Sequence, residues 1–288
     1  MSEPSPNLKD RKFHPFNRQL GLHQFDTFHL RFMEQQCADL IDCLDQLVEN
    51  TLKRAPIPAA GYELFRETSG GHQNNEHKME RSIWKAWKPQ GERCGTSFSS
   101  TCKTIPFYQV RIQRPRQKEL KGDWGRVDLV GVDEMEQLPV LIELKTGCAN
   151  DRLLRVIVEV AAYALALRKS WKGAFRDDWC EALRTHGIKA EVPLEWGSCR
   201  LVCAAPKKFW KRRLGLLGAE GKIRAQAWKP FFDLVDAFGR HGLSFEFVSV
   251  DFKGCDKSRD FKDLAAGLPI VTGARAVPLR DFVELMMD

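Results

Sequence analysis

Apolar residues recur along this chain with two different periods, and these periods predict helices that alternate with strands. Helices are predicted over four segments: 25–53, as one long helix or two short ones, 76–87, 152–169 and 230–238. Apolar residues recur at helical spacing in the first, 76–87 is amphipathic, and 152–169 contains no Gly or Pro. Pro230 is expected in the first turn of the last of these. Shorter runs rich in β-branched and aromatic residues are typical of strands: 104–112, 200–205 and 243–250.

The remaining segments are less regular. Residues 1–24 have no period and are expected to form an arm, and a short helix is expected over 279–287. Residues 170–187 are polar and mixed, with Trp171 and Trp179 as expected packing anchors.

The most informative stretch is residues 125–145, GRVDLVGVDEMEQLPVLIELK. Two apolar runs flank a polar tip at 133–137, a pattern that predicts a β-hairpin. If the hairpin folds about its centre, Asp128 lies opposite Glu143. Lys145 then follows Glu143 on the same face, because strand side chains alternate between the two faces. Two carboxylates and one ammonium are thus predicted to meet, although directly opposed acids repel one another.

A hard divalent cation would explain why two acids are placed together. Mg²⁺ binds oxygen ligands, typically one or two carboxylates with water and substrate phosphate. It acidifies a bound water and offsets charge on a phosphoryl oxygen, while Lys145 would hold the attacking water or stabilise the transition state. The alternative is a salt bridge from Lys145 to one acid, with the other acid solvated on an exposed face. The spacing alone leaves both interpretations open.

The helix predicted next in the chain is apolar on almost every side and is therefore expected to be buried. Four polar residues, spaced three, four and four apart, form one stripe along it: Arg152, Arg155, Glu159 and Tyr163. A short link joins this helix to Lys145, so the stripe is placed to face the carboxylates. The alternative is that the stripe is the wet face of a half-buried helix.

These residues resemble the PD-(D/E)xK nuclease superfamily and, within it, the RecB-like nuclease domains. The pattern in those domains is an aspartate on one strand, D/E-x-K on the next strand and Q-x3-Y on the following helix. This chain has Asp128, then Glu143-Leu144-Lys145, then Glu159 and Tyr163, with glutamate in place of the glutamine. The likeness covers residues 125–170, and the order and spacing of the motifs carry it.

The resemblance implies an α/β fold of the restriction-endonuclease-like type. Its central mixed four-stranded sheet is flanked by helices, here with a helical N-terminal extension. The implied organisation has four parts: a flexible arm at 1–24, a helical region with the first core helix at 25–103, a nuclease-like core at 104–255 and a C-terminal extension packed on the core at 256–288.

The resemblance also implies roles for individual residues. Asp128, Glu143 and the backbone carbonyl of Leu144 would bind Mg²⁺ or Mn²⁺. Lys145 would be the catalytic lysine, and Tyr163 would belong to the catalytic set through the helix motif.

The helix that precedes the sheet in this family often supplies a further acid or histidine near the metal. In the segment 76–87 the candidates are His77 and Glu80, which lie three apart on one face, with Glu76 as an alternative, and Glu80 would join the catalytic residues. Their spacing does not demand a ligand role, so a solvated surface position is the competing interpretation.

Composition and cysteines narrow the class of protein. With 288 residues and 43% hydrophobic content the chain is typical of a folded globule. No apolar run approaches the ~20 residues that span a bilayer, and the N-terminus is not a signal peptide, so no membrane partner is expected. The nine cysteines include no C-x-x-C pair, which disfavours a zinc ribbon. Free thiols in a reducing, cytoplasmic compartment are expected.

Basic residues form two clusters that suit a nucleic acid. One precedes the hairpin, at 111–121, and the other, at 207–213, contains Phe209 and Trp210. Basic side chains bind phosphates and aromatic ones stack on bases, although a solvated surface is the alternative. The residues expected to bind nucleic acid are Arg114, Arg116, Arg126, Lys207, Lys208, Lys211 and Arg212.

The function expected from these features is metal-dependent hydrolysis of DNA phosphodiester bonds, with single-stranded DNA among the substrates considered. The first alternative is a catalytically inactive protein of the nuclease fold that binds DNA. The intact set of two acids and a lysine argues against it, since such a protein does not need two acids on one face. The second alternative is an assembly subunit whose aromatic residues form a protein interface, which the eight tryptophans permit.

Overall fold

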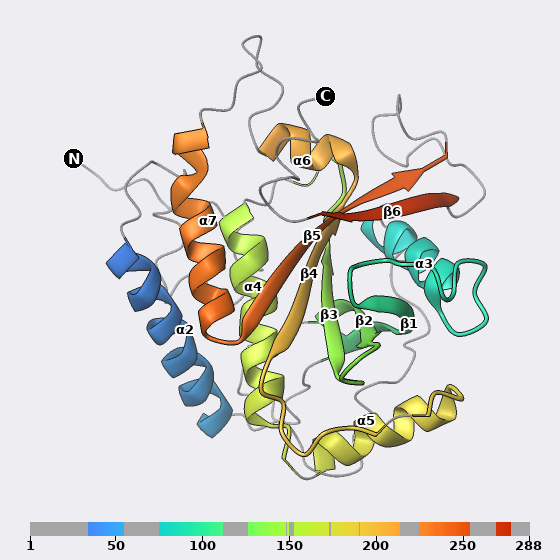
Figure 1. Cartoon of the computed structure of the whole chain (residues 1–288), viewed down its shortest axis with the longest axis horizontal. Helices are drawn as coiled ribbons and strands as arrows, with labels where there is room; N and C mark the ends of the chain where they lie inside the picture. The colour runs from blue at the N-terminus through green and yellow to red at the C-terminus, as the bar shows by residue number, and fades with distance from the viewer. Residues whose placement is uncertain are drawn as a thin grey trace.

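A six-stranded mixed β-sheet lies between a layer of helices on one face and a single described helix on the other (Figure 1). The structure is a computed structural model that describes residues 34–54, 75–111, 126–147, 149, 153–172, 174–189, 191–213, 225–253 and 269–277. The strands are β1 (Cys102–Arg111), β2 (Arg126–Asp133), β3 (Pro139–Leu144), β4 (Cys199–Ala205), β5 (Leu243–Phe252) and β6 (Val271–Val277). The helices are α2 (Glu34–Arg54), α3 (Asn75–Trp87), α4 (Leu153–Lys169), α5 (Ala174–Thr185), α6 (Lys207–Arg213) and α7 (Ala225–Arg240).

The order of strands across the sheet follows the order in the chain, β1-β2-β3-β4-β5-β6. Strands β1, β2 and β3 form an antiparallel meander, β3, β4 and β5 are parallel, and β6 returns antiparallel to β5. The parallel connections carry the helices, as crossovers between parallel strands require. The predicted α/β class with a mixed, helix-flanked sheet is confirmed. The predicted number of four strands is wrong, because β5 extends the sheet beyond β4 and β6 pairs with β5.

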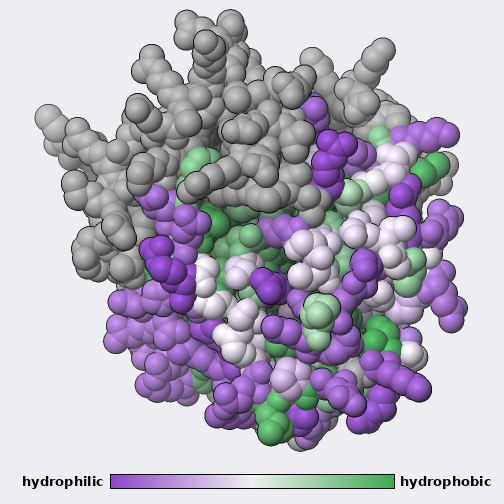
Figure 2. Space-filling model, in the orientation of Figure 1, coloured by the Kyte–Doolittle hydropathy of each residue, from purple (hydrophilic) through white to green (hydrophobic). Residues whose placement is uncertain are grey.

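Two apolar cores lie on the two faces of the sheet. On one face α4 and α7 pack against the strands with α2 outside them, and hydrophilic residues cover the outer side of α2 (Figures 1 and 2). On the other face Met79, Ile83 and Trp87 of α3 pack against Ile142 and Val202. Helix α3 contacts β1, β2 and also β6, so the sheet curls around it. The residues of α3 that point inward are thereby enclosed.

Most predicted helices and strands are present. The differences concern where a helix begins and which further elements complete the fold. Helices α3 and α4 confirm the segments expected from periodicity. Helix α7 begins at Ala225, so Pro230 is its sixth residue and not in its first turn, and the prediction of a proline start is wrong. Helix α5 and strand β6 were not predicted. The arm at 1–24 and the helix at 279–287 lie outside the described residues.

The tryptophans expected as packing anchors fulfil that role. Trp171 and Trp179 are both buried, with exposed fractions of 1% and 0%. The indole N–H of Trp179 donates to the carbonyl of Gln137 at 2.9 Å, which ties α5 to the tip of the hairpin. Among the helices in the described ranges, none combines the length and the apolarity needed to cross a bilayer.

Candidate active site

The β2–β3 hairpin brings Asp128 beside Glu143. Leu129 pairs with Ile142, so the register predicted from the symmetry of the hairpin is confirmed, and its continuation sets Asp128 opposite Glu143. The turn lacks an Asn-Gly pair. Instead, the carboxylate of Asp133 accepts hydrogen bonds from the backbone N–H groups of Met135 and Glu136, at 2.9 Å each. An Asp that bonds the backbone two and three residues on stabilises such turns.

The ladder between β2 and β3 opens at the site. The N–H of Leu144 faces β2, where a regular ladder would offer a backbone carbonyl, but it donates to Asp128 Oδ2 at 2.7 Å. On the other edge the N–H of Lys145 donates to the carbonyl of Ala204 at 3.0 Å, so β3 stays paired with β4. In an extended residue the N–H and C=O point to the same side. The carbonyl of Leu144 therefore points to the side on which Asp128 lies.

Lys145 and Glu143 form a buried ion pair. Lys145 Nζ donates to Glu143 Oε1, and the two side chains are 9% and 4% exposed. The second carboxylate oxygen, Glu143 Oε2, is buried without a hydrogen-bond partner, whereas Asp128 remains partly exposed. The salt bridge that the sequence left open as an alternative is therefore present, but the other acid is not solvated on an exposed face.

Acidic side chains outnumber basic ones around Glu143, and this excess of negative charge raises the pKa values of the groups there. Burial raises the pKa of the Glu143 carboxyl well above its usual range, and the charge of Asp128 raises it further against the opposing effect of Lys145. Burial likewise raises the pKa of Asp128, to which the charge of Glu80 adds. Burial alone would lower the pKa of Lys145, but the charges of Glu143, Glu159 and Asp128 keep it above its ordinary value. The lysine therefore stays protonated among excess carboxyl groups.

Helix α3 supplies a further acid from the other face of the sheet. Glu80 is only 2% exposed, so the alternative of a solvated surface position is excluded. Burial raises the pKa of Glu80 to about 8, with a hydrogen bond from Gln109 opposing the rise and the charges of Glu76 and Glu143 adding to it. The charge of Glu76 also raises the pKa values of Asp128 and Lys145. His77, the other candidate, is half-buried on the same helix.

Helix α4 directs its polar stripe toward the same centre. The hydroxyl of Tyr163 donates to Glu159 Oε1 at 3.3 Å, and Arg155 Nε lies 3.9 Å from Glu159 Oε2. Tyr163 is buried, and burial raises the pKa of its hydroxyl well above 10.0, as do the nearby charges of Glu159 and Glu143. The stripe therefore faces the carboxylates. Arg152, its first predicted member, lies outside the described residues.

Gln109 was not identified from the sequence, and the structure places it next to this centre. It is 4% exposed and lies on β1 between Tyr108, which pairs with Leu129, and Val110, which pairs with Val127, so it is opposite Asp128. Its Nε2 donates to Glu80 Oε2 at 2.8 Å, and its Oε1 accepts from Arg126 Nη1 at 3.2 Å. A neutral polar residue within an apolar strand, TIPFYQVRI, was the only signal.

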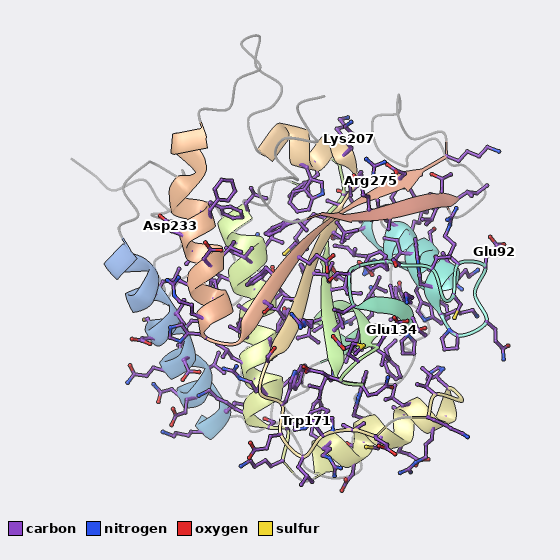
Figure 3. The ribbon with its side chains drawn as sticks, in the orientation of Figure 1. Glu92, Glu134, Trp171, Lys207, Asp233 and Arg275 are labelled. Atoms are coloured by element: carbon purple, nitrogen blue, oxygen red, sulfur yellow. The ribbon has the colours of Figure 1, made fainter. Side chains whose placement is uncertain are left out.

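Part of the second basic cluster reaches the site. Lys207 and Lys208 are exposed at the start of α6, directly after β4. A Cβ added to Gly147, two residues after Lys145, would be 3.7 Å from Lys208 Cβ. Arg275, another residue that the sequence did not suggest, is exposed on β6, and Figure 3 shows it at the same end of the sheet as Lys207.

The expectation that Phe209 and Trp210 stack on bases is wrong. Their exposed fractions are 0% and 1%, and the indole N–H of Trp210 donates to the carbonyls of Ala205 and Val248, at 3.1 Å each. These rings anchor α6 to the sheet, and Lys207 and Lys208 are exposed at its start. Of the other predicted nucleic-acid contacts, Arg126 is exposed. Four lie where no side chain is described: Arg114, Arg116, Lys211 and Arg212.

The donor set fits a hard cation. Within the described ranges, no three or more His, Cys, Asp or Glu side chains converge in a way that would hold a metal ion by themselves. The set implied by the resemblance has two carboxylates and one carbonyl, and the buried Glu143 Oε2 without a hydrogen-bond partner is an oxygen that such an ion would satisfy. The cysteines whose side chains are described are free thiols, as expected: Cys43, Cys94, Cys102, Cys180, Cys199 and Cys203.

Two carboxylates and a lysine meet at the C-terminal end of β3, with acids from both flanking helices around them and lysines of α6 beside them. The chain matches no protein-family model, and no characterised protein or solved structure is significantly similar to it.

Proposed function

We propose that this protein is a metal-dependent nuclease that hydrolyses DNA phosphodiester bonds, with Asp128, Glu143 and Lys145 at the reaction centre. The observation that carries the proposal is the opening of the β2–β3 ladder, where Asp128 and Glu143 meet beside a buried lysine. Buried acids of like charge destabilise a fold unless something compensates them. The single ammonium of Lys145 compensates one acid, and a bound cation would compensate the others.

The order of elements supports a restriction-endonuclease-like core. The chain forms a helix, three antiparallel strands, a second helix and, after the inserted helix α5, a strand parallel to the third: α3, β1–β3, α4 and β4. In the nuclease resemblance the acids lie on the second and third strands and the tyrosine motif on the second helix. Asp128, Glu143 and Tyr163 occupy those places.

The residues present divide the chemistry between them. Asp128, Glu143 and the Leu144 carbonyl would hold Mg²⁺ or Mn²⁺, which acidifies a bound water and offsets charge on the phosphoryl oxygen. Lys145 remains a cation because of the surrounding acids, and its three N–H donors allow it to keep Glu143 while it orients the attacking water or contacts a phosphoryl oxygen. Glu159 accepts a hydrogen bond from Tyr163 and lies within ion-pair distance of Arg155.

The charge around the centre favours a polyanionic substrate. Lys207 and Lys208 lie beyond the end of β4, next to the segment that follows Lys145. Arg275 lies further along the same end, since Ala205 pairs with Ser249 and Ser249 with Arg275. A nucleic-acid backbone crossing the ends of β3 to β6 would meet these side chains in turn.

The test is cleavage of DNA by the full chain, on 5′-labelled single-stranded and duplex oligonucleotides and on a plasmid, with Mg²⁺, with Mn²⁺ and with EDTA. Asp128→Asn, Glu143→Gln and Lys145→Met should each lower the rate by at least about 100-fold, the usual effect of removing one group that acts on the transition state. The variant Asp128→Asn is chosen because asparagine still offers an oxygen to the Leu144 N–H.

The matched control is Glu136→Gln, an exposed acid at the tip of the same hairpin, which should cut at the wild-type rate. Full activity of Glu143→Gln would refute the assignment. DNA binding in EDTA without cleavage in any metal would instead support the catalytically inactive alternative.

A further inference from the structure

Gln109 has an unusual backbone conformation for a residue inside a strand. Its φ is 50°, in the left-handed region that non-glycine residues rarely adopt. The other positive-φ residues other than glycine in the described ranges, Gln90 and Gln137, lie in turns. Such a conformation persists only where the surroundings hold it, and it is concentrated at functional sites. At Gln109 the two hydrogen bonds of the side chain provide that hold.

The chemistry of the two bonds requires an amide. Gln109 donates to the carboxylate of Glu80 and accepts from the guanidinium of Arg126. Among side chains of this length, a carboxylate cannot donate to Glu80 and a cation cannot accept from Arg126. Gln109 therefore connects the acid of α3 with an arginine of β2 across the edge strand β1.

Arg126 is exposed and lies two residues before Asp128 on β2. Residues i and i+2 of a strand share a face and are about 7 Å apart along it, a separation similar to that of neighbouring phosphates in a nucleotide chain. A guanidinium is a planar fork of N–H donors that matches phosphate oxygens. On the opposite side of the centre, beyond β4, lie Lys207 and Lys208.

We propose that Gln109 is a positioning residue that aims Arg126 at the substrate phosphate next to the one being hydrolysed, on the β1 side of the site. The proposal rests on the nuclease function proposed above. It assigns one phosphate contact to Arg126 and makes that contact depend on Gln109.

The experiment measures binding and needs no cleavage. The full chain is titrated against a fluorescent DNA oligonucleotide in EDTA over a range of salt concentrations. Each lost phosphate contact lowers the slope of log K against log salt by about 0.9 on duplex DNA and by about 0.7 on a single strand. Arg126→Ala should show this loss, whereas Arg184→Ala, an exposed arginine on α5, should not.

The variants of Gln109 test whether it acts through Arg126. Gln109→Leu should lose part or all of the same slope, and the double variant Gln109→Leu/Arg126→Ala should bind no more weakly than Arg126→Ala alone. Gln109→Glu puts a carboxylate beside the guanidinium that competes with the phosphate for it, so this variant should also lose the slope of that contact, and it serves if the leucine variant does not fold.

Equal slopes for wild type and Arg126→Ala, or equal weakening by Gln109→Leu in both backgrounds, would overturn this proposal while leaving the nuclease function intact. Failure of the wild type to bind DNA at low salt would instead count against the nuclease function itself.

Discussion

Replacement of Glu80 by glutamine should make the metal-free protein more stable at alkaline pH. The carboxyl is 2% exposed, and burial raises its pKa from 4.5 to about 8. Below pH 4.5 the folded and unfolded chains both hold the proton. Between pH 4.5 and about 8 only the folded chain holds it, so stability falls as the pH rises, and above pH 8 the full penalty is present. Glutamine does not titrate and avoids the penalty.

The size of the effect follows from the shift. At about 1.4 kcal/mol per pH unit, a rise of the pKa from 4.5 to about 8 corresponds to a loss of up to about 5 kcal/mol. With a urea dependence of about 3 kcal/mol per molar, the urea midpoint of Glu80→Gln relative to wild type should rise by up to about 1.6 M between pH 4 and pH 9. The amide oxygen of the new residue can still accept the hydrogen bond from Gln109.

The assay is urea unfolding in EDTA at pH 4 and pH 9, followed by circular dichroism. Glu136→Gln, at the exposed tip of the hairpin, should shift the midpoint by the same small amount at both pH values. Millimolar Mg²⁺ should stabilise the wild type at pH 9 more than it stabilises Glu80→Gln, because a cation near Glu80 favours the ionised carboxyl. An identical midpoint difference at the two pH values would show that Glu80 is not buried among acids.

Two further predictions concern the core. Gly131→Ala should lower the free energy of unfolding by about 1–3 kcal/mol, because its new Cβ would overlap Cys102 Sγ. Cys102→Ala in the same chain should restore most of that free energy in urea unfolding, and simple additivity of the two changes would contradict this. In a short pulse of iodoacetamide, read by mass spectrometry, the exposed Cys43 and Cys94 should react in the folded protein. Cys102 and Cys199 should react only after unfolding, because burial raises the pKa of both thiols to about 12. Labelling of Cys102 or Cys199 in the folded protein would disprove their burial.

Local sequence patterns were sufficient to predict the two elements that form the centre of the candidate site. The hairpin register depends on two apolar runs of matched length around a short tip, and the pairing of Leu129 with Ile142 follows from that symmetry. The burial of α4 follows from its composition, since an almost wholly apolar helix has no other stable place. The candidate site residues Asp128, Glu143 and Tyr163 lie on these two elements, and Lys145 directly follows β3.

Features that depend on distant pairing could not be predicted. Strand β6, VTGARAV, has weak strand propensity, and pairing with β5 makes it a strand and sets the position of Arg275. The burial of Phe209 and Trp210 depends on carbonyls of β4 and β5, which local sequence does not place. The left-handed backbone of Gln109 has no signature in residue type, because glutamine has no special preference for that region.

The anchoring of α6 has a consequence for the cost of binding a polyanion. A helix of seven residues is too short to persist by itself in water. The indole of Trp210 donates to carbonyls of two strands and so holds these two helical turns in place. The backbone beneath Lys207 and Lys208 is thus already ordered before any phosphate arrives. In the proposed complex with DNA, the freedom lost at this point of the chain would be that of the two side chains, and no loop would have to be ordered there.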